Sequence, residues 1–186
     1  MTEKQKALIR GIDQFHYGLV SKNDSTGYES ETMKRIEGLN QVQISFSSVS
    51  GEYYGDNMKI IEETNLTGAS LTINIASIPE ADLAEMLGQD VEVDEETGRI
   101  TSYTAVGDTQ KEICVGFRVR LSTGEFVYYK FYVGRAQLGD ETLQTADSNI
   151  NYTDQSLTIN CVPMSFEIDG KYRLRKKIKT ETVIED

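Results

Sequence analysis

Apolar and polar residues alternate along much of this chain, which is the pattern of β-strands. It is clearest in residues 115–133, where two alternating runs flank a turn at 122–125 and predict a β-hairpin. One face of this hairpin is apolar and expected to be buried: Val115, Phe117, Val119, Leu121, Val127, Tyr129, Phe131 and Val133. The other row of the return strand is also mainly aromatic, so we expect another part of the molecule or another copy to cover it; it consists of Phe126, Tyr128, Lys130 and Tyr132.

The same alternation predicts further strands elsewhere in the chain. They fall in residues 12–20, 41–48, 66–76, 91–103 as a hairpin with an acidic tip, 157–161 and 171–178. Residues 21–31 are polar and rich in turn-forming residues, so they predict a loop. Residues 49–65 form a long segment in which only 58–61 has an ordered pattern. A connection of this length is usually functional or mobile.

One helix is predicted at about residues 79–88. Pro79 suits the first helical turn, the next residues include two acids at the positive end of the helix dipole, and Gly88 ends the pattern. Leu83, Met86 and Leu87 share its apolar side. Many short strands and one helix predict a mainly β fold, a β-sandwich or partial barrel with one flanking α-helix.

The length and the distribution of charge indicate one domain with a basic end. The 186 residues have a net charge of −11, which argues against a protein that holds DNA by general phosphate attraction. Residues 171–186 contain six basic and three acidic residues, for +3, whereas residues 1–170 contain 13 and 27, for −14. We therefore divide the chain into an N-terminal arm (1–10), a β-sandwich domain (11–170) and a basic C-terminal strand or arm (171–186).

The residue types of most catalytic and metal sites are missing. His16 is the only histidine, which excludes a histidine-based triad and a zinc site with two histidines. The sequence has no nucleophile elbow and no glycine-rich phosphate loop. Residues 90–98 resemble the start of a calcium loop, but Glu95 stands where the obligatory glycine belongs. These features predict a protein that is not an enzyme and uses no cofactor or metal ion.

The spacing of the cysteines and the hydropathy of the chain indicate the cellular compartment in which we expect the protein. Cys114 and Cys161 are 47 positions apart. This spacing suits neither a disulfide framework nor a metal knuckle, so we expect buried thiols in a reducing compartment. The N-terminus lacks the apolar run of a signal peptide, and no stretch has the ~18 apolar residues of a membrane span. We expect the chain to stay in the cytosol until assembly and to have no membrane partner.

Five segments of the chain follow one another in an order typical of a single protein family. They are GIDQFHYGLV (11–20), EYYGDNMKIIEETNLTGASLTINI (52–75), IPEADLAEMLGQ (78–89), CVGFRVRLSTGEFVYYKFYVGR (114–135) and TADSNINYTDQSLTINC (145–161). This series resembles the major tail proteins of long-tailed bacteriophages, in the phi13-type family. The resemblance covers most of residues 10–178, and its most specific part is YYGDN followed by TGASLTINI and the helix.

The resemblance implies a structural virion protein, the tube protein of a non-contractile siphovirus tail. Such proteins are small β-sandwiches with one flanking helix that self-assemble into hexameric rings, and the rings stack into a hollow tube for DNA ejection. The family also implies a tape measure protein, a tail terminator and distal tail proteins as partners. The expected location is the phage tail, after a period in the host cytoplasm. Six copies at −11 give −66 per ring, and an acidic lumen would let DNA pass without specific binding.

The candidate subunit-interface residues fall into three groups. The long segment 50–65 is expected to be mobile in the free subunit and ordered by a neighbouring ring; its candidates are Tyr53, Tyr54, Asp56, Asn57 and Lys59. The doubly apolar strand contributes the row Phe126, Tyr128, Lys130 and Tyr132. The basic arm, whose alternative role is an edge strand that blocks aggregation, is expected to lie on the acidic body of an adjacent subunit through Arg173 and Arg175.

Three other readings of the sequence stay open. A tube protein of a contractile tail or of a phage-like particle would share the fold. A carbohydrate-binding module could use Tyr53, Tyr54, Tyr128, Tyr129 and Tyr132 as a sugar-stacking platform, although the chain has no tryptophan. The third reading is an acidic monomeric β-sandwich whose aromatic row is ordinary core.

Overall fold

The computed structural model describes residues 7–56, 58–139 and 153–183. These residues form a mainly β fold with a single helix, as the sequence predicted. The elements are β1 (Ile9–Asp24), β2 (Gly27–Ser30), β3 (Lys34–Ile36), β4 (Leu39–Gly55), β5 (Met58–Ile75), α1 (Glu80–Leu87), β6 (Asp90–Asp94), β7 (Arg99–Tyr103), β8 (Glu112–Leu121), β9 (Phe126–Leu138), β10 (Gln155–Val162), β11 (Glu167–Ile168), β12 (Lys171–Tyr172) and β13 (Arg175–Thr180).

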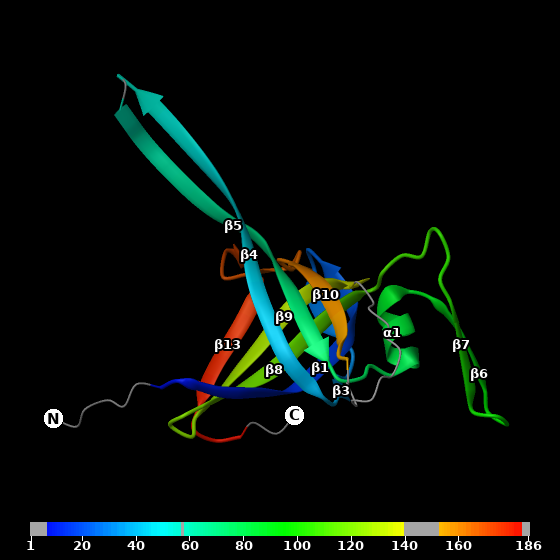
Figure 1. The fold of residues 1–186 in the computed structure, drawn as a ribbon. Coiled ribbons are helices and arrows are strands. Elements are labelled where there is room, and N and C mark those ends of the chain that lie inside the picture. The colour runs from blue at the N-terminus through cyan, green and yellow to red at the C-terminus, as the bar shows by residue number, and fades with distance from the viewer. Residues whose placement is uncertain (1–6, 57, 140–152, 184–186) are drawn as a thin grey trace.

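One large antiparallel sheet makes up most of the body. Its main order is β2-β1-β8-β9-β10-β5-β4, with β3 beside β1 and β13 beside β9. Strand β9 is long enough to pair with two strands along one edge, since its first half pairs with β13 and its second half with β10. The sheet curls until β4 comes back towards β1, but these two strands are not hydrogen-bonded to each other, so the partial barrel stays open (Figure 1).

The concave side of the curled sheet forms the core. Its residues are apolar and almost fully buried, as the alternation in the sequence predicted: Phe15, Tyr17, Leu71, Ile73, Ile75, Val115, Phe117, Val119, Phe131, Leu157 and Ile159. Burial of one large apolar side chain contributes roughly 1.5 to 3 kcal/mol. The alternating strands therefore account for most of the driving force of this fold.

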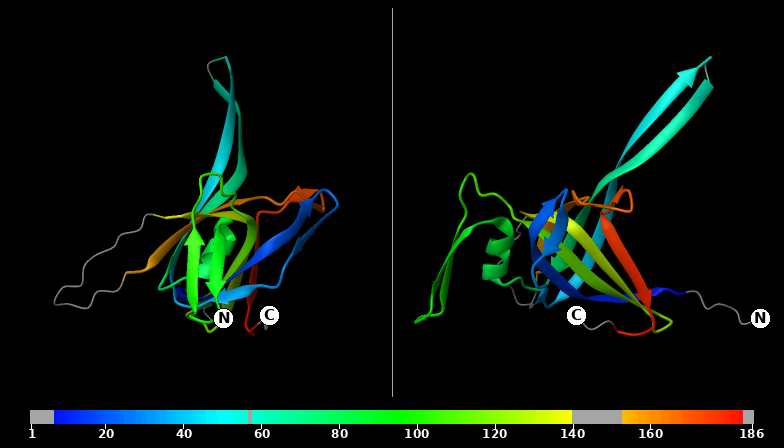
Figure 2. Two further views of the ribbon diagram at one scale, coloured as in Figure 1. Left: turned by 90° about the vertical axis from the view of Figure 1, so that its right-hand side faces the viewer. Right: turned by 180° about the vertical axis from the view of Figure 1, so that it is seen from behind.

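Helix α1 lies at the side of the body opposite the projecting β4–β5 hairpin, next to the hairpin β6–β7 (Figures 1 and 2). Leu83, Met86 and Leu87 are its buried residues, as predicted, together with Ala84. Pro79 is the N-cap, and Gly88 ends the helix in the left-handed region with φ 71°. A Cβ at Gly88 would lie 2.1 Å from the carbonyl oxygen of Thr109, so glycine is required there both by conformation and by space.

The loop predicted for residues 21–31 is wrong. Strand β1 continues to Asp24, turns at residues 25–26 and returns as β2. Asp24 Oδ1 accepts hydrogen bonds from the backbone N–H groups of Thr26 and Gly27, at 2.7 and 3.2 Å. The polar composition therefore marks the tight turn of a hairpin instead of a long connection.

The prediction that residues 49–65 have little ordered structure is also wrong. These residues are the outer parts of β4 and β5, which pair from Ser48–Leu66 to Gly55–Met58 and project from the body as a two-stranded hairpin (Figures 1 and 2). We call residues 48–55 and 58–66 the arm, as distinct from the N-terminal arm (1–10) and the basic C-terminal arm (171–186). Two register shifts interrupt the alternation in this hairpin, between Ser47 and Ser48 and between Tyr53 and Tyr54, which is why it does not read as a strand in the sequence.

Some sequence predictions fall outside the described residues. They concern Asn57, residues 1–6 of the N-terminal arm, residues 145–152 of the last family-like segment and the final three residues, 184–186. Residues 9 and 10 already belong to β1, and residues 175–180 belong to the main sheet as β13.

Candidate assembly interface

The arm has one charged face and one mainly apolar face. Cross-strand partners share a face, which places Glu52 beside Glu62 and Tyr54 beside Lys59. On this face Lys59 Nζ lies 2.6 Å from Glu52 Oε1 and 2.8 Å from Glu62 Oε2, and the Tyr54 hydroxyl donates to Glu52 Oε2 at 2.7 Å. The hydrogen bonds from Lys59 and Tyr54 hold the pKa of Glu52 below its usual value.

The opposite face of the arm combines the predicted candidate Tyr53 with two side chains that were not among the sequence candidates, Val49 and Ile61. Tyr53 pairs with Ile61, and Val49 lies on the same face four residues earlier. Most large apolar side chains of the arm are at least half exposed: Val49, Tyr53, Tyr54, Met58, Ile60, Ile61 and Leu66. Asp56 lies at the turn with φ 51°. The arm is thus a ribbon with a charged face and an exposed apolar face, and its large apolar side chains have no cover among the described residues.

The aromatic row of β9 lies on the convex side of the sheet and is partly covered by its own chain. All four residues of the row are half-buried. The ring of Tyr28 meets that of Tyr132 edge to face at 5.4 Å, and its hydroxyl donates to the Tyr132 carbonyl at 2.6 Å. The guanidinium of Arg118 lies 4.9 Å from the centre of the Phe126 ring. The predicted cover is therefore supplied in part by β2 and β8.

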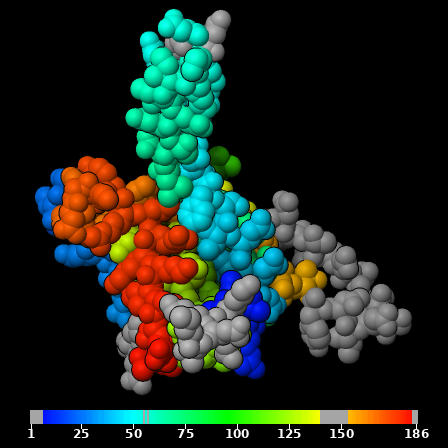
Figure 3. All heavy atoms as spheres, turned by 90° about the vertical axis from the view of Figure 1, so that its left-hand side faces the viewer, coloured from blue at the N-terminus to red at the C-terminus, as the bar shows by residue number. Residues whose placement is uncertain are grey.

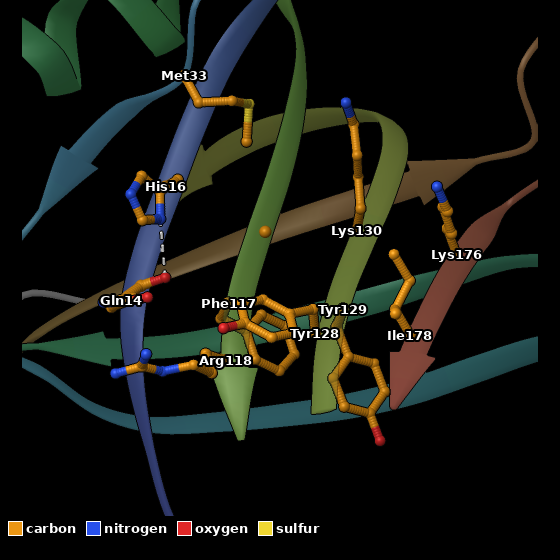
Figure 4. Close-up of a pocket in the computed structure, with 11 residues that line it drawn as sticks. Gln14, His16, Met33, Phe117, Arg118, Tyr128, Tyr129, Lys130, Lys176 and Ile178 are labelled. Atoms are coloured by element: carbon orange, nitrogen blue, oxygen red, sulfur yellow. Dashed lines mark hydrogen bonds between the residues drawn. The ribbon is translucent and has the colours of Figure 1, made fainter. Parts of the chain in front are cut away.

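Beside this row the convex face has a hollow of about 210 Å³ (Figure 4). Gly116 lies in its lining, where β8 has no side chain, while Met33 borders it on one side and Lys130 and Lys176 on the other. The pairing aligns Gly116 with Lys130 and Lys130 with Lys176 across three strands. The convex face therefore presents the ammonium groups of Lys130 and Lys176 beside this hollow, which Tyr128 also lines.

Arg118 is the buried charged residue at the centre of this face, with 6% of its surface exposed. Its Nε and Nη2 donate to the two carboxylate oxygens of Asp13, at 2.7 and 2.9 Å, and Arg120 Nε donates to Asp13 at 2.7 Å. These hydrogen bonds, above all that from Arg118, lower the pKa of Asp13. Asp13 precedes a bulge in β1, where Gln14 has φ 54°. The bulge directs the carboxylate toward two arginines at once.

Strand β13 has basic side chains on both of its faces. Arg175 lies over the rings of Phe46 and Tyr129, at 4.8 and 5.7 Å, and Lys177 lies 5.3 Å from the centre of the Tyr129 ring. Lys176 and Ile178 project toward the hollow on the convex side. Arg173 precedes the strand and pairs with Asp169 at 2.9 Å. Arg173 and Arg175 therefore both contact groups of their own chain.

The structure thus brings together two of the three predicted groups. The β9 row and β13 are neighbours in one sheet, whereas the arm lies apart from both and extends away from the body (Figures 1 and 3). The sequence feature that would have found the arm is the run of apolar residues at 58, 60, 61 and 66, read together with 49 and 53.

Other chemistry is sparse within the described part of the chain. No group of three or more histidine, cysteine, aspartate or glutamate side chains there could hold a metal ion. Cys114 and Cys161 are buried free thiols, and burial raises the pKa of Cys161 to about 12. Asp94 accepts hydrogen bonds from Glu96 and Thr97 and so closes the acidic β6–β7 turn. Among the described residues, no helix is long and apolar enough to cross a membrane.

Comparison with known proteins adds no family assignment to this geometry. No protein-family model matches the chain. A search of curated proteins finds no match to it either.

Proposed function

We propose that this chain is the major tail (tube) protein of a non-contractile phage tail, which assembles as stacked hexameric rings around a conduit for DNA. The proposal begins from the ordered series of sequence segments that resemble this family. The observation that supports it best is the arm, because its exposed apolar residues need a partner that the described part of the chain does not provide.

An isolated two-stranded hairpin is at best marginally stable in water. The arm extends from the body with its apolar face open, and Tyr53, Met58 and Ile60 are each more than half exposed. A contiguous patch of this kind is typical of an interaction surface. In a stack of rings, the neighbouring ring would cover it.

The body of the protein also fits a ring. Its open, curled antiparallel sheet leaves strand edges that a neighbouring subunit can extend, and a ring closes such edges. Its charge suits a conduit, since −11 per chain repels the phosphates of passing DNA. The location that follows is the virion, after synthesis in the host cytoplasm, with tape measure, terminator and distal tail proteins as partners at the ends of the tube.

The tyrosines argue against the carbohydrate-binding alternative. Tyr129 stacks on Phe117, with ring centres 5.1 Å apart and planes at 10°, on the concave side of the sheet. Tyr53 and Tyr54 lie on the arm, on its opposite faces, and Tyr132 contacts Tyr28. These side chains do not form one platform for a sugar.

Native mass spectrometry of concentrated protein tests the proposal, with a glycan array as the parallel assay. We expect assemblies in multiples of six subunits and no glycan binding. A monomer at all concentrations that binds a glycan would refute the proposed function, and a closed ring with another number of subunits would refute the hexamer.

A further inference from the structure

Strand β13 has one paired edge and one open edge. Arg175–Thr180 pairs with residues 126–131 of β9 on one side. No described strand lies along the other side, and the face that bears β13 is exposed below the arm (Figure 3). An open edge presents unpaired backbone N–H and C=O groups and is a template for one more strand.

The charge of β13 is concentrated and mostly unpaired. Its six residues include four basic side chains: Arg175, Lys176, Lys177 and Lys179. Within the described residues only Lys179 has an ion-pair partner, Glu125 at 2.7 Å. Next to the strand on the convex side lie the half-buried rings of the β9 row. The strand with the open edge is thus basic, and the aromatic row lies across its paired edge.

The arm has the opposite properties. Its acids Glu52, Glu62 and Glu63 and its one base Lys59 give a net charge of −2, and Asp56 in the turn between its strands adds one more negative charge. Among the described residues the two strands of the arm pair only with each other, because β10 pairs with β5 only at residues 69–75, outside the arm. Both long edges of the arm are therefore open as well. The arm is an acidic ribbon with an apolar face.

The arm does not meet its own β13, because it extends away from the body (Figures 1 and 2). We propose that the arm of one copy lies along the open edge of β13 in a second copy and adds a strand to that copy's sheet. Backbone hydrogen bonds between strands would supply affinity. The acids of the arm would meet the basic side chains of β13, and its apolar face would lie beside Ile178, on the same side of the sheet as the aromatic row.

This inference rests on the proposed function for the number and order of copies, and it names the two surfaces in contact. A charge exchange tests it. One variant reverses two charges of the arm (Glu62→Lys with Glu63→Lys), a second reverses two charges of β13 (Lys176→Glu with Lys177→Glu), and a third combines all four changes. We expect each double variant to raise the concentration of half-assembly about tenfold, and the combined variant to return it to within about threefold of the unmodified protein.

The β6–β7 turn supplies a matched control. Glu95→Lys with Glu96→Lys makes the same change of charge at the far side of the body, and we expect it to change half-assembly less than threefold. Circular dichroism of each monomer checks folding. The contact is refuted if the arm and control variants change the concentration of half-assembly equally, or if the combined variant does not restore it. Ring formation by the unmodified protein would in that case leave the proposed function intact.

Cross-linking gives a second readout that does not depend on ring formation or on charge reversal in β13. Glu63 lies on the apolar face of the arm, opposite Gly51, and Lys176 lies on the same side of β13 as Ile178. A copy with Glu63→Cys is mixed with a copy with Lys176→Cys and oxidised; the native thiols are buried and give little background. We expect a disulfide-linked heterodimer, and at least fivefold less of it when Glu95→Cys replaces Glu63→Cys, because a disulfide forms only between Cα atoms within about 7 Å. Equal yields from both pairs would overturn the proposed contact.

Discussion

Replacing Asp13 by asparagine tests the buried charge pair at the centre of the convex face. Asparagine keeps the shape of the side chain but offers one oxygen acceptor, and its amide group would point a donor at a guanidinium donor. Arg118 would then remain in the sheet with almost no access to water. The three hydrogen bonds that Asp13 accepts from Arg118 and Arg120 would fall to one or two, and the compensating negative charge would be lost.

The size of the effect follows from burial. Breaking a fully buried ion pair costs about 3 to 5 kcal/mol. Asp13 is 27% exposed, so water can replace part of the lost interaction. We therefore expect the free energy of unfolding to fall by about 2 to 3 kcal/mol at pH 7. The exposed pair Arg173–Asp169 is the matched control, and Asp169→Asn should lower the free energy of unfolding by less than about 1 kcal/mol.

Urea denaturation followed by circular dichroism measures both variants, because the chain has no tryptophan for fluorescence. The pKa of Asp13 in the folded protein is below its ordinary value of 3.8. Its contribution is therefore fully present above this value and is lost as the pH falls through the folded-state pKa. The difference between Asp13→Asn and the unmodified protein should be constant from pH 7 to about pH 5 and shrink below it. Equal effects of Asp13→Asn and Asp169→Asn would refute the reasoning.

Three further predictions concern the helix and the arm. Tyr17→Phe removes a buried hydroxyl that donates to Asp82 and Glu85, at 2.6 and 2.8 Å. We expect urea denaturation to show a free energy of unfolding lower by about 1.5 to 3 kcal/mol. No change would show that other donors fully satisfy the two carboxylates. Gly88→Ala should lower the melting temperature by at least about 4 °C in a thermal scan, because alanine would have a strained φ there and its Cβ would clash with the Thr109 carbonyl. An unchanged melting temperature would contradict this. Hydrogen exchange of the outward-facing arm amides in residues 49–54 should be fast in the monomer and slow after assembly; equal rates in both states would mean that no neighbour covers the arm.

Local patterns were enough to predict the concave half of the fold. In residues 115–121 of β8 apolar side chains alternate with glycine and arginine, and the burial of Val115, Phe117 and Val119 follows directly from that alternation. The helix could be predicted equally well, because Pro79 and Gly88 fix its ends through backbone conformation. Fold class and core could therefore be inferred without knowledge of long-range contacts.

The convex face and the arm could not be inferred in the same way. The cover of the aromatic row depends on Tyr28, which lies 104 residues from Tyr132, the residue it contacts. Met33 reaches the convex face because Gly18 and Gly116 leave room, and a Cβ on Gly18 would lie 3.1 Å from its sulfur. In the arm, bulges break the period of two that marks a strand. Such features depend on three-dimensional register, which a single sequence does not specify.

Electron microscopy of the concentrated, purified protein tests the central claim most directly. The proposed function predicts hollow rings or tubes with sixfold rotational symmetry in averaged end views, and density for the arm that bridges from one subunit to the next. Particles that remain compact monomers at every concentration, or assemblies without a central channel, would contradict it.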